Sequence, residues 1–281
     1  MEPVKLIAAI ILVSLTFGAG LDVDRDSLKA TFKNIGLFSR ALLANFVIVP
    51  ILGVLFARLF ALSPDIATGF LLMAIAPGVP FVLAQARRTG GRLSLAVELA
   101  IFLPLLSIVT VPITAAWVLP AGAEAHLPIA QFAKTLVFFQ LVPLLAGIAL
   151  AEPFPTLAAR LGRPLQIVFF VAVLGLIVLL FPKLVHLVSS IYGSRAIFAV
   201  LCLTLLSMAT GWLLGGPARR DRAVLGIGTT LRNIGLCSLI ATTSFAGTDV
   251  GASVITYFVI QFVVVTIFGT YFKRTATPES G

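Results

Sequence analysis

Two charged side chains that could take part in chemistry lie deep inside apolar stretches of the chain. Arg232 stands ten residues beyond Arg222, and Glu98 stands six residues beyond Arg92. At 1.5 Å per helical residue, these spacings correspond to depths of about 15 Å and about 9 Å. If the stretches cross a membrane, each charge needs a partner, because a lone charge in hydrocarbon is costly. The hypotheses are a Glu98–Arg232 ion pair, or an anion site at Arg232 with a proton carrier at Glu98.

The composition shows what kind of element must position these charges. Of 281 residues, 59% are apolar and only 11% are charged, and the mean hydropathy is +1.12. Soluble domains carry about 45–50% apolar and about 25% charged residues. A water-soluble enzyme, a disordered chain and a secreted disulfide scaffold are therefore excluded. The sequence predicts an all-α polytopic membrane protein, with the lipid bilayer as its surroundings.

Nine apolar segments are long enough to cross a bilayer, and the short connections make them one transmembrane domain, residues 1–281. The segments are 4–21, 36–60, 65–87, 93–118, 129–151, 164–187, 194–215, 222–246 and 249–272. The net charge of +9 does not indicate a nucleic-acid partner, because basic residues stand at the ends of apolar runs. The sequence carries no signal for an oligomeric state.

Basic residues are distributed unequally between the two sides of the predicted membrane. Thirteen fall on one side: Arg25, Lys29, Lys33, Arg87, Arg88, Arg92, Arg160, Arg163, Arg219, Arg220, Arg222, Lys273 and Arg274. Four fall on the other: Lys5, Arg58, Lys183 and Arg195. The positive-inside rule predicts an outer N-terminus and a cytoplasmic C-terminus in the inner (plasma) membrane.

Two of the nine segments contain residues that interrupt helices. Segment 65–87 contains Pro77-Gly78-Val79-Pro80, and segment 222–246 places glycines around Arg232 and Asn233. The two segments stand five apart, so they enter the membrane from opposite faces. This pattern is typical of inverted repeats whose broken helices cross at a binding site, although prolines can also merely kink a packing helix. At the crossing we expect a substrate site of Pro77, Gly78, Glu98, Thr229, Thr230, Arg232 and Asn233.

Four stretches resemble motifs of the bile acid:sodium symporter family. They are Phe17-Gly-Ala-Gly-Leu-Asp22, Ala44-Asn45-Phe46 through Pro50, Ala76-Pro77-Gly78 followed by Gly90 and Leu93-Ser94, and Thr230-Leu-Arg232-Asn233-Ile-Gly-Leu236. The resemblance implies a panel (4–21 and 129–187) beside a core (36–118 and 194–272), in which the two broken helices cross. It also implies a small or amphipathic organic anion as substrate, usually carried with sodium.

The sodium ligands of that family are mostly missing here. Its acidic ligand falls at Gly228, its glutamine at Arg232 and a threonine ligand at Glu98, and an arginine repels a hard cation. Asn45, Ser94, Thr229 and Thr230 remain as oxygen donors. We therefore expect Arg232 to act as a built-in cation, with Glu98, Asn45 and Ser94 in ion coupling. A fixed Glu98–Arg232 pair that only locks the fold, and two charges that never meet, are the alternatives.

These observations favour a secondary active transporter of a small organic anion that works by alternating access. The alternatives are a sodium-coupled symporter with a rebuilt cation site, and a non-transporting receptor or channel. An enzyme is disfavoured and no cofactor is expected, although sodium or proton coupling is possible. Gln85 and Gln140 are expected to be interhelical hydrogen-bond partners, and Arg87 and Arg88 to anchor at lipid head groups.

Overall fold

The computed structural model describes residues 3–23, 35–78, 80–120, 122 and 129–274. Apart from one isolated β-bridge, the regular structure of this part is entirely helical. Seven of its helices are long and apolar enough to cross a membrane: Pro3–Leu21, Ile35–Leu59, Leu93–Val118, Phe132–Ala151, Pro155–Pro182, Ala196–Leu214 and Val250–Arg274. The prediction of an all-α polytopic membrane protein is confirmed.

Two further segments consist of short helices separated by non-helical residues. They are α5 (Pro64–Ile75) with α6 (Pro80–Thr89), and α12 (Arg219–Thr230) with α13 (Ile234–Ser244). Pro80 begins α6, where a proline costs no helical hydrogen bond, and the side chain of Asn233 caps α13 by accepting from the Leu236 N–H at 3.0 Å. Both predicted interruptions are therefore present.

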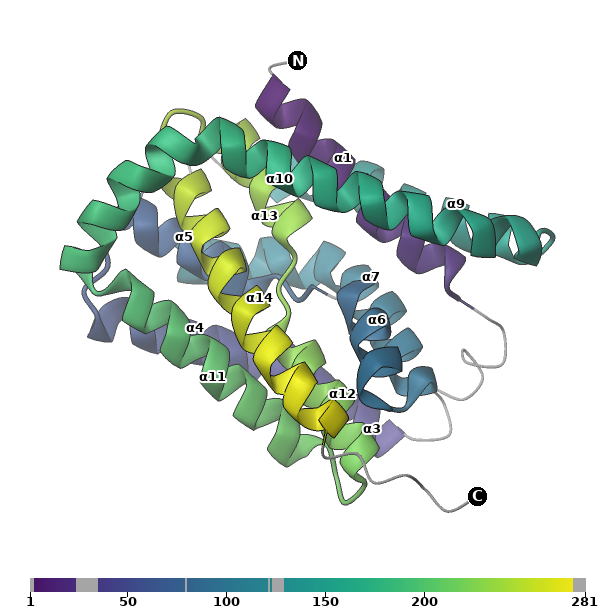
Figure 1. The fold of residues 1–281 in the computed structure, drawn as a ribbon. Helices are drawn as coiled ribbons and strands as arrows, with labels where there is room; N and C mark the ends of the chain where they lie inside the picture. The colour runs from purple at the N-terminus through teal and green to yellow at the C-terminus, as the bar shows by residue number, and fades with distance from the viewer. Residues whose placement is uncertain (1–2, 24–34, 79, 121, 123–128, 275–281) are drawn as a thin grey trace.

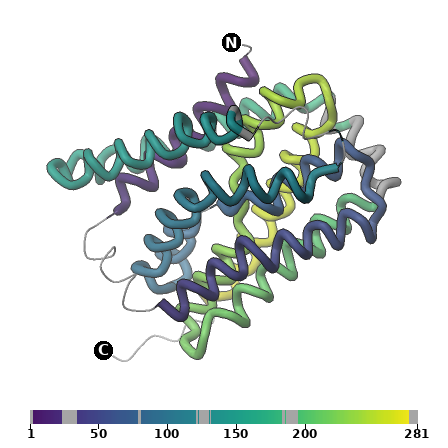
Figure 2. The backbone as a smooth tube through the Cα atoms, turned by 180° about the vertical axis from the view of Figure 1, so that it is seen from behind, coloured from purple at the N-terminus to yellow at the C-terminus, as the bar shows by residue number. Residues whose placement is uncertain are grey.

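Three helices form a layer along one side of the molecule (Figures 1 and 2). They are α1 (Pro3–Leu21), α9 (Val142–Ala151) and α10 (Pro155–Ser194), and we call them the α1–α9–α10 layer. A Cβ atom on Gly20 of α1 would lie 2.9 Å from the Cα atom of Gly147 in α9, so these helices meet backbone to backbone. Helix α8 (Ile129–Leu136) and the π-helical turn η3 (Val137–Leu141) lead into α9.

Helix α10 is longer than the sequence predicted. The segment was expected to begin at 164, whereas α10 begins at Pro155 and continues through Pro164. Pro155 occupies the first turn, where it needs no hydrogen-bond acceptor, and the residues that follow are mostly good helix formers. The longer helix carries Arg163 within its length instead of leaving it in a loop.

The remaining helices surround the two interrupted pairs. They are α3 (Ile35–Leu43), the π-helical turn η1 (Ala44–Ile48), α4 (Val49–Leu59), α7 (Leu93–Val118), α11 (Ala196–Leu214) and α14 (Val250–Arg274). Small residues bring them close: a Cβ atom on Gly211 of α11 would lie 2.7 Å from the Cα atom of Gly226 in α12. Arg25, Lys29 and Lys33, which entered the charge count, lie outside the described residues.

Candidate functional site

The two interruptions meet each other in the interior of the molecule. Pro77 and Arg232 form an antiparallel β-bridge. The Gly78 N–H donates to the Leu231 carbonyl at 3.0 Å, and the Asn233 N–H donates to the Ala76 carbonyl at 3.0 Å. Backbone groups freed by a broken helix need partners inside a membrane, and each break here supplies partners to the other. Pro77, Gly78, Arg232 and Asn233 are thus brought together as predicted.

Arg232 is buried at this crossing, with 3% of its surface exposed. Its Nη2 atom donates to the Thr229 carbonyl at 2.6 Å, so the guanidinium turns back to the C-terminal end of α12. Its Nε and Nη1 atoms have no hydrogen-bond partner among the described residues. The Arg232 peptide is held from α14, since its N–H donates to Gln261 Oε1 at 2.9 Å and its carbonyl accepts from Gln261 Nε2 at 3.3 Å.

The expected ion pair between Glu98 and Arg232 is not formed in this structure. Within the described part of the chain, the hydrogen bond to the Thr229 carbonyl is the only hydrogen bond that the Arg232 guanidinium makes. Glu98 is also buried, in α7, where its neighbour Leu99 packs toward Gly228 of α12. Spacing along the sequence predicted the depth of the two charges, but it did not determine which face of each helix they occupy.

The other predicted donors differ in their surroundings. The Thr230 hydroxyl donates to the Gly226 carbonyl of its own helix at 2.8 Å, whereas the buried Thr229 hydroxyl has no partner among the described residues. Asn45 is buried in η1, where its Nδ2 atom donates to the Ala41 carbonyl at 3.0 Å and its Oδ1 atom is without a described partner. Ser94 lies half-buried near the start of α7. No hydrogen bond in the described part joins Asn45 or Ser94 to Arg232.

A buried polar network connects the crossing to η3. The Asn233 Nδ2 atom donates to Gln140 Oε1 at 3.0 Å. The Gln140 Nε2 atom donates in turn to the Pro104 carbonyl at 2.6 Å and to the Ser107 hydroxyl at 2.7 Å, both on α7. Gln140 is fully buried. The expectation that Gln140 is an interhelical hydrogen-bond partner is confirmed.

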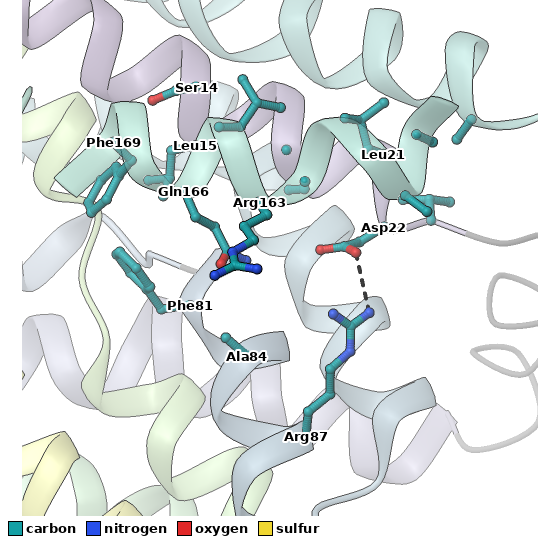
Figure 3. Close-up of a pocket in the computed structure, with 18 of the residues that line it drawn as sticks. Ser14, Leu15, Leu21, Asp22, Phe81, Ala84, Arg87, Arg163, Gln166 and Phe169 are labelled. Atoms are coloured by element: carbon teal, nitrogen blue, oxygen red, sulfur yellow. Dashed lines mark hydrogen bonds and ion pairs between the residues drawn. The ribbon is translucent and has the colours of Figure 1, made fainter. Parts of the chain in front are cut away.

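A cavity of about 1190 Å³ lies between the α1–α9–α10 layer and the helices α6 and α14 (Figure 3). Its wall includes three arginines (Arg87, Arg88 and Arg163), two carboxylates (Asp22 and Glu152) and three uncharged polar side chains (Ser14, Gln85 and Gln166). Four phenylalanines, Phe81, Phe169, Phe170 and Phe262, form an aromatic part of the wall. Such a wall suits a ligand with both a charged and an apolar part.

Comparison with known proteins decides the family of this chain. The family model described as the Sodium Bile acid symporter family matches residues 9–191, which is more than half of the chain. The chain belongs to the sodium bile acid symporter family. The family consists of transporters and not of enzymes. The matched residues of this symporter-family chain include the first interrupted pair, α5 and α6, and end before the second.

Two curated relatives are similar to part of this symporter-family chain. It is 23% identical over 159 residues to the P3 protein of Mus musculus and 24% identical over 159 residues to the P3 protein of Bos taurus. Each alignment covers 56% of this chain and 33% of the relative. The chain therefore matches about a third of the length of these curated relatives.

The sequence predicted that Arg87 and Arg88 of this symporter-family protein anchor at lipid head groups, and in the structure both also contact other parts of the chain. Arg87 Nη2 forms an ion pair with Asp22 Oδ1 at 3.3 Å, and Arg88 Nη2 donates to the Thr270 hydroxyl at 3.1 Å. Burial raises the pKa of Asp22 above its usual 3.8, although Arg87 opposes this rise. The ion pair connects the end of α1 to α6 at the cavity wall.

Several cavity residues were not recognised as site residues from the sequence. Arg163 was counted only as a basic residue near the membrane surface, and Gln166 and the phenylalanines were not considered. A signal was present, because Arg163, Gln166 and Phe170 recur at three- and four-residue spacings and so share one face of α10. Only the packing of α10 against α6 shows that this face lines a cavity.

Proposed function

We propose that this protein is a secondary active transporter that moves a small organic anion by alternating access. The panel would consist of α1, α8, η3, α9 and α10, and the core of the other helices. Each interrupted pair would serve as one span, so that nine spans in an inverted repeat place the N-terminus outside and the C-terminus in the cytoplasm. The interrupted helices that meet in the core support this arrangement.

The cavity between panel and core is the observation that carries the proposal. Its volume of about 1190 Å³ exceeds the range of about 300–1,000 Å³ that is usual for pockets holding drug-sized ligands. Its three arginines outnumber its two carboxylates, which favours an anion over a cation. We infer that a substrate reaches the transport site through this space.

The position of the cavity indicates which side of the transporter is open. The cavity walls include Arg87, Arg88 and Arg163, which the positive-inside rule assigns to the cytoplasmic side. Gln140 stands eight residues before Ile148, a cavity-wall residue of α9. It therefore lies about 12 Å from Ile148 along the helix axis, toward the opposite side of the membrane. Its hydrogen bond to Asn233 joins panel to core there. We infer an inward-open state that the Gln140 network closes on the outer side.

Arg232 supports transport without sodium. The guanidinium donates to the Thr229 carbonyl and so places a positive charge at the crossing. A sodium ion at this place would instead be coordinated by carbonyl oxygens. The remaining Nε and Nη1 donors suit a carboxylate of the substrate. In this proposal Thr229, Thr230, Asn233, Pro77 and Gly78 surround the anion, and the buried Glu98 carries a proton.

The membership of the family supports a second candidate, a sodium-coupled symporter with a rebuilt cation site. The Asn45 Oδ1 and Thr229 Oγ1 atoms are buried without a described partner and are of the oxygen type that sodium prefers. A receptor or a channel is the third candidate. The three differ in saturation and in ion dependence, so one assay separates them.

The experiment is uptake and counterflow of a labelled bile acid, the substrate class in the family's name, in proteoliposomes. Saturable counterflow that is equal in sodium and potassium, and that increases with an inward proton gradient, is the expected result. Uptake that requires sodium would favour the second candidate. Flux without saturation or counterflow would reject the transporter and favour a channel.

A further inference from the structure

The three arginines of the cavity differ in what they contact. Arg87 is paired with Asp22, and Arg88 donates to the hydroxyl of Thr270. Arg163 makes no hydrogen bond or ion pair within the part of the chain that the structure describes. Figure 3 shows its side chain extending from α10 into the space above α6. Arg163 therefore presents unused donors to the interior of the cavity.

An aromatic surface lies on the same side of α10. The rings of Phe81 and Phe169 are 4.7 Å apart between centroids, and those of Phe81 and Phe170 are 5.7 Å apart. Phe170 also approaches Phe262 of α14, at 6.4 Å. Phe170 follows Arg163 by seven residues, so the aromatic surface begins about 10 Å farther along the helix. A charged donor and an apolar surface are thus separated by the length of a small amphipathic molecule.

We propose that Arg163 is the anion-binding residue of this cavity, and that its ligand carries one anionic group on an apolar ring system. The anionic group would pair with the guanidinium of Arg163, while the rings would contact Phe81, Phe169 and Phe170. This inference rests on the proposed function, in which the cavity is the route of the substrate. A soluble organic anion and the anionic head group of a lipid share this chemistry.

The test uses the full chain in nanodiscs of phosphatidylcholine, which carry no net charge. The probes are 2-naphthoate and its neutral counterpart 2-naphthalenemethanol, and their dissociation constants are measured by calorimetry. The wild type should bind naphthoate at least tenfold more tightly than the alcohol. Arg163→Gln should remove this preference and leave alcohol binding unchanged, and Arg163→Lys should retain part of it.

Arg160→Gln is the matched control. Arg160 is an exposed arginine on the same helix, three residues before Arg163, and is not part of the cavity wall. The Arg160→Gln variant should bind naphthoate as tightly as the wild type does. Equal naphthoate binding by Arg163→Gln and the wild type would overturn the proposal, and so would a wild type that does not prefer naphthoate to the alcohol. Phe170→Ala should weaken the binding of both probes, because it removes apolar surface.

A second set of nanodiscs, containing phosphatidylglycerol, distinguishes the two sources of the anion. If the anionic lipid weakens naphthoate binding in the wild type but not in Arg163→Gln, the site binds lipid head groups. If naphthoate binding is unchanged, the site selects the soluble anion. Counterflow separates this inference from the proposed function. If Arg163→Gln transports normally, only the proposed role of Arg163 is rejected. If the wild type does not transport but binds naphthoate in an Arg163-dependent way, only the proposed transport function is rejected.

Discussion

Gly78 and Arg232, which lie 154 residues apart in the sequence, meet backbone to backbone where the two interrupted helices cross. A Cβ atom on Gly78 would collide with the carbonyl group of Arg232. The Gly78 N–H donates to the Leu231 carbonyl, the residue next to Arg232. This contact fixes the peptide from which the Arg232 side chain extends, while the guanidinium itself donates to the Thr229 carbonyl.

Gly78→Ala should strongly destabilise the protein. The added methyl group has no free space and would push the two breaks apart, at a cost of about 1–3 kcal/mol or more. The melting temperature in detergent measures the effect. Gly36→Ala is the control, because a Cβ atom there meets nothing within 4 Å and alanine favours a helix. A Gly78→Ala protein as stable as the wild type would contradict the close crossing.

Gln140→Leu should destabilise the protein by about 1–3 kcal/mol, since it leaves the Asn233 amide and the Pro104 carbonyl buried without this partner. Unfolding in sodium dodecyl sulfate measures the change. Gln166→Leu is the matched control, because Gln166 lines the cavity and makes no hydrogen bond within the described residues. Similar losses in both variants would mean that the network between η3 and the crossing contributes nothing specific.

Arg232→Gln and Glu98→Thr should affect stability independently, because the two side chains form no ion pair in this structure. The change in the free energy of unfolding of the double variant should equal the sum of the single changes within about 0.5 kcal/mol. Unfolding in detergent measures all three variants. A coupling well above that value would show that the two charges meet after all.

The pH dependence of the protein's stability should reveal the raised pKa of Asp22. Burial raises the pKa of Asp22 above 3.8, so the folded protein keeps a proton on this carboxyl at pH values where the unfolded chain has lost it. Its contribution to stability is thus fully present below pH 3.8 and is lost as the pH rises through the raised pKa. Asp22→Asn should remove this slope from melting temperatures measured between pH 4 and pH 7.

Arg87→Gln tests the cause of the same effect. Arg87 lowers the pKa of Asp22, so its removal should move the pH window of Asp22 upward. If Arg87→Gln leaves the window in place or moves it downward, Arg87 does not lower the pKa of Asp22. Because this ion pair joins α1 to α6, the pair Arg87→Gln and Asp22→Asn also reports how firmly these helices are held together.

Much of the fold could be predicted because its causes act locally along the chain. Pro77, Pro80 and the glycines around Arg232 interrupt helices through their own geometry, and the structure contains both interruptions. Long apolar runs predicted the helices that can span a membrane. The start predicted at 164 was wrong, since α10 begins at Pro155 and continues through Pro164.

The candidate site was predicted less completely, because it depends on which helix faces meet. Arg232 and Asn233 were identified as polar residues in an interrupted apolar segment, and they do lie at the crossing. The Glu98–Arg232 ion pair, one of the hypotheses from the sequence, is not formed in this structure. Gln261, which holds the Arg232 peptide, and Arg163, which lines the cavity, were missed because their roles depend on the helices that they face.

By itself the sequence determined that this protein is helical, membrane-embedded and interrupted at two places, because hydrophobicity and backbone restrictions act on each residue and its near neighbours. Only the tertiary structure decided that Gly78 meets Arg232, that Gln140 bonds to Asn233 and that Arg163 lines a cavity. These contacts join residues far apart in sequence. They depend on the rotation and tilt with which helices pack, which small differences in side-chain fit decide.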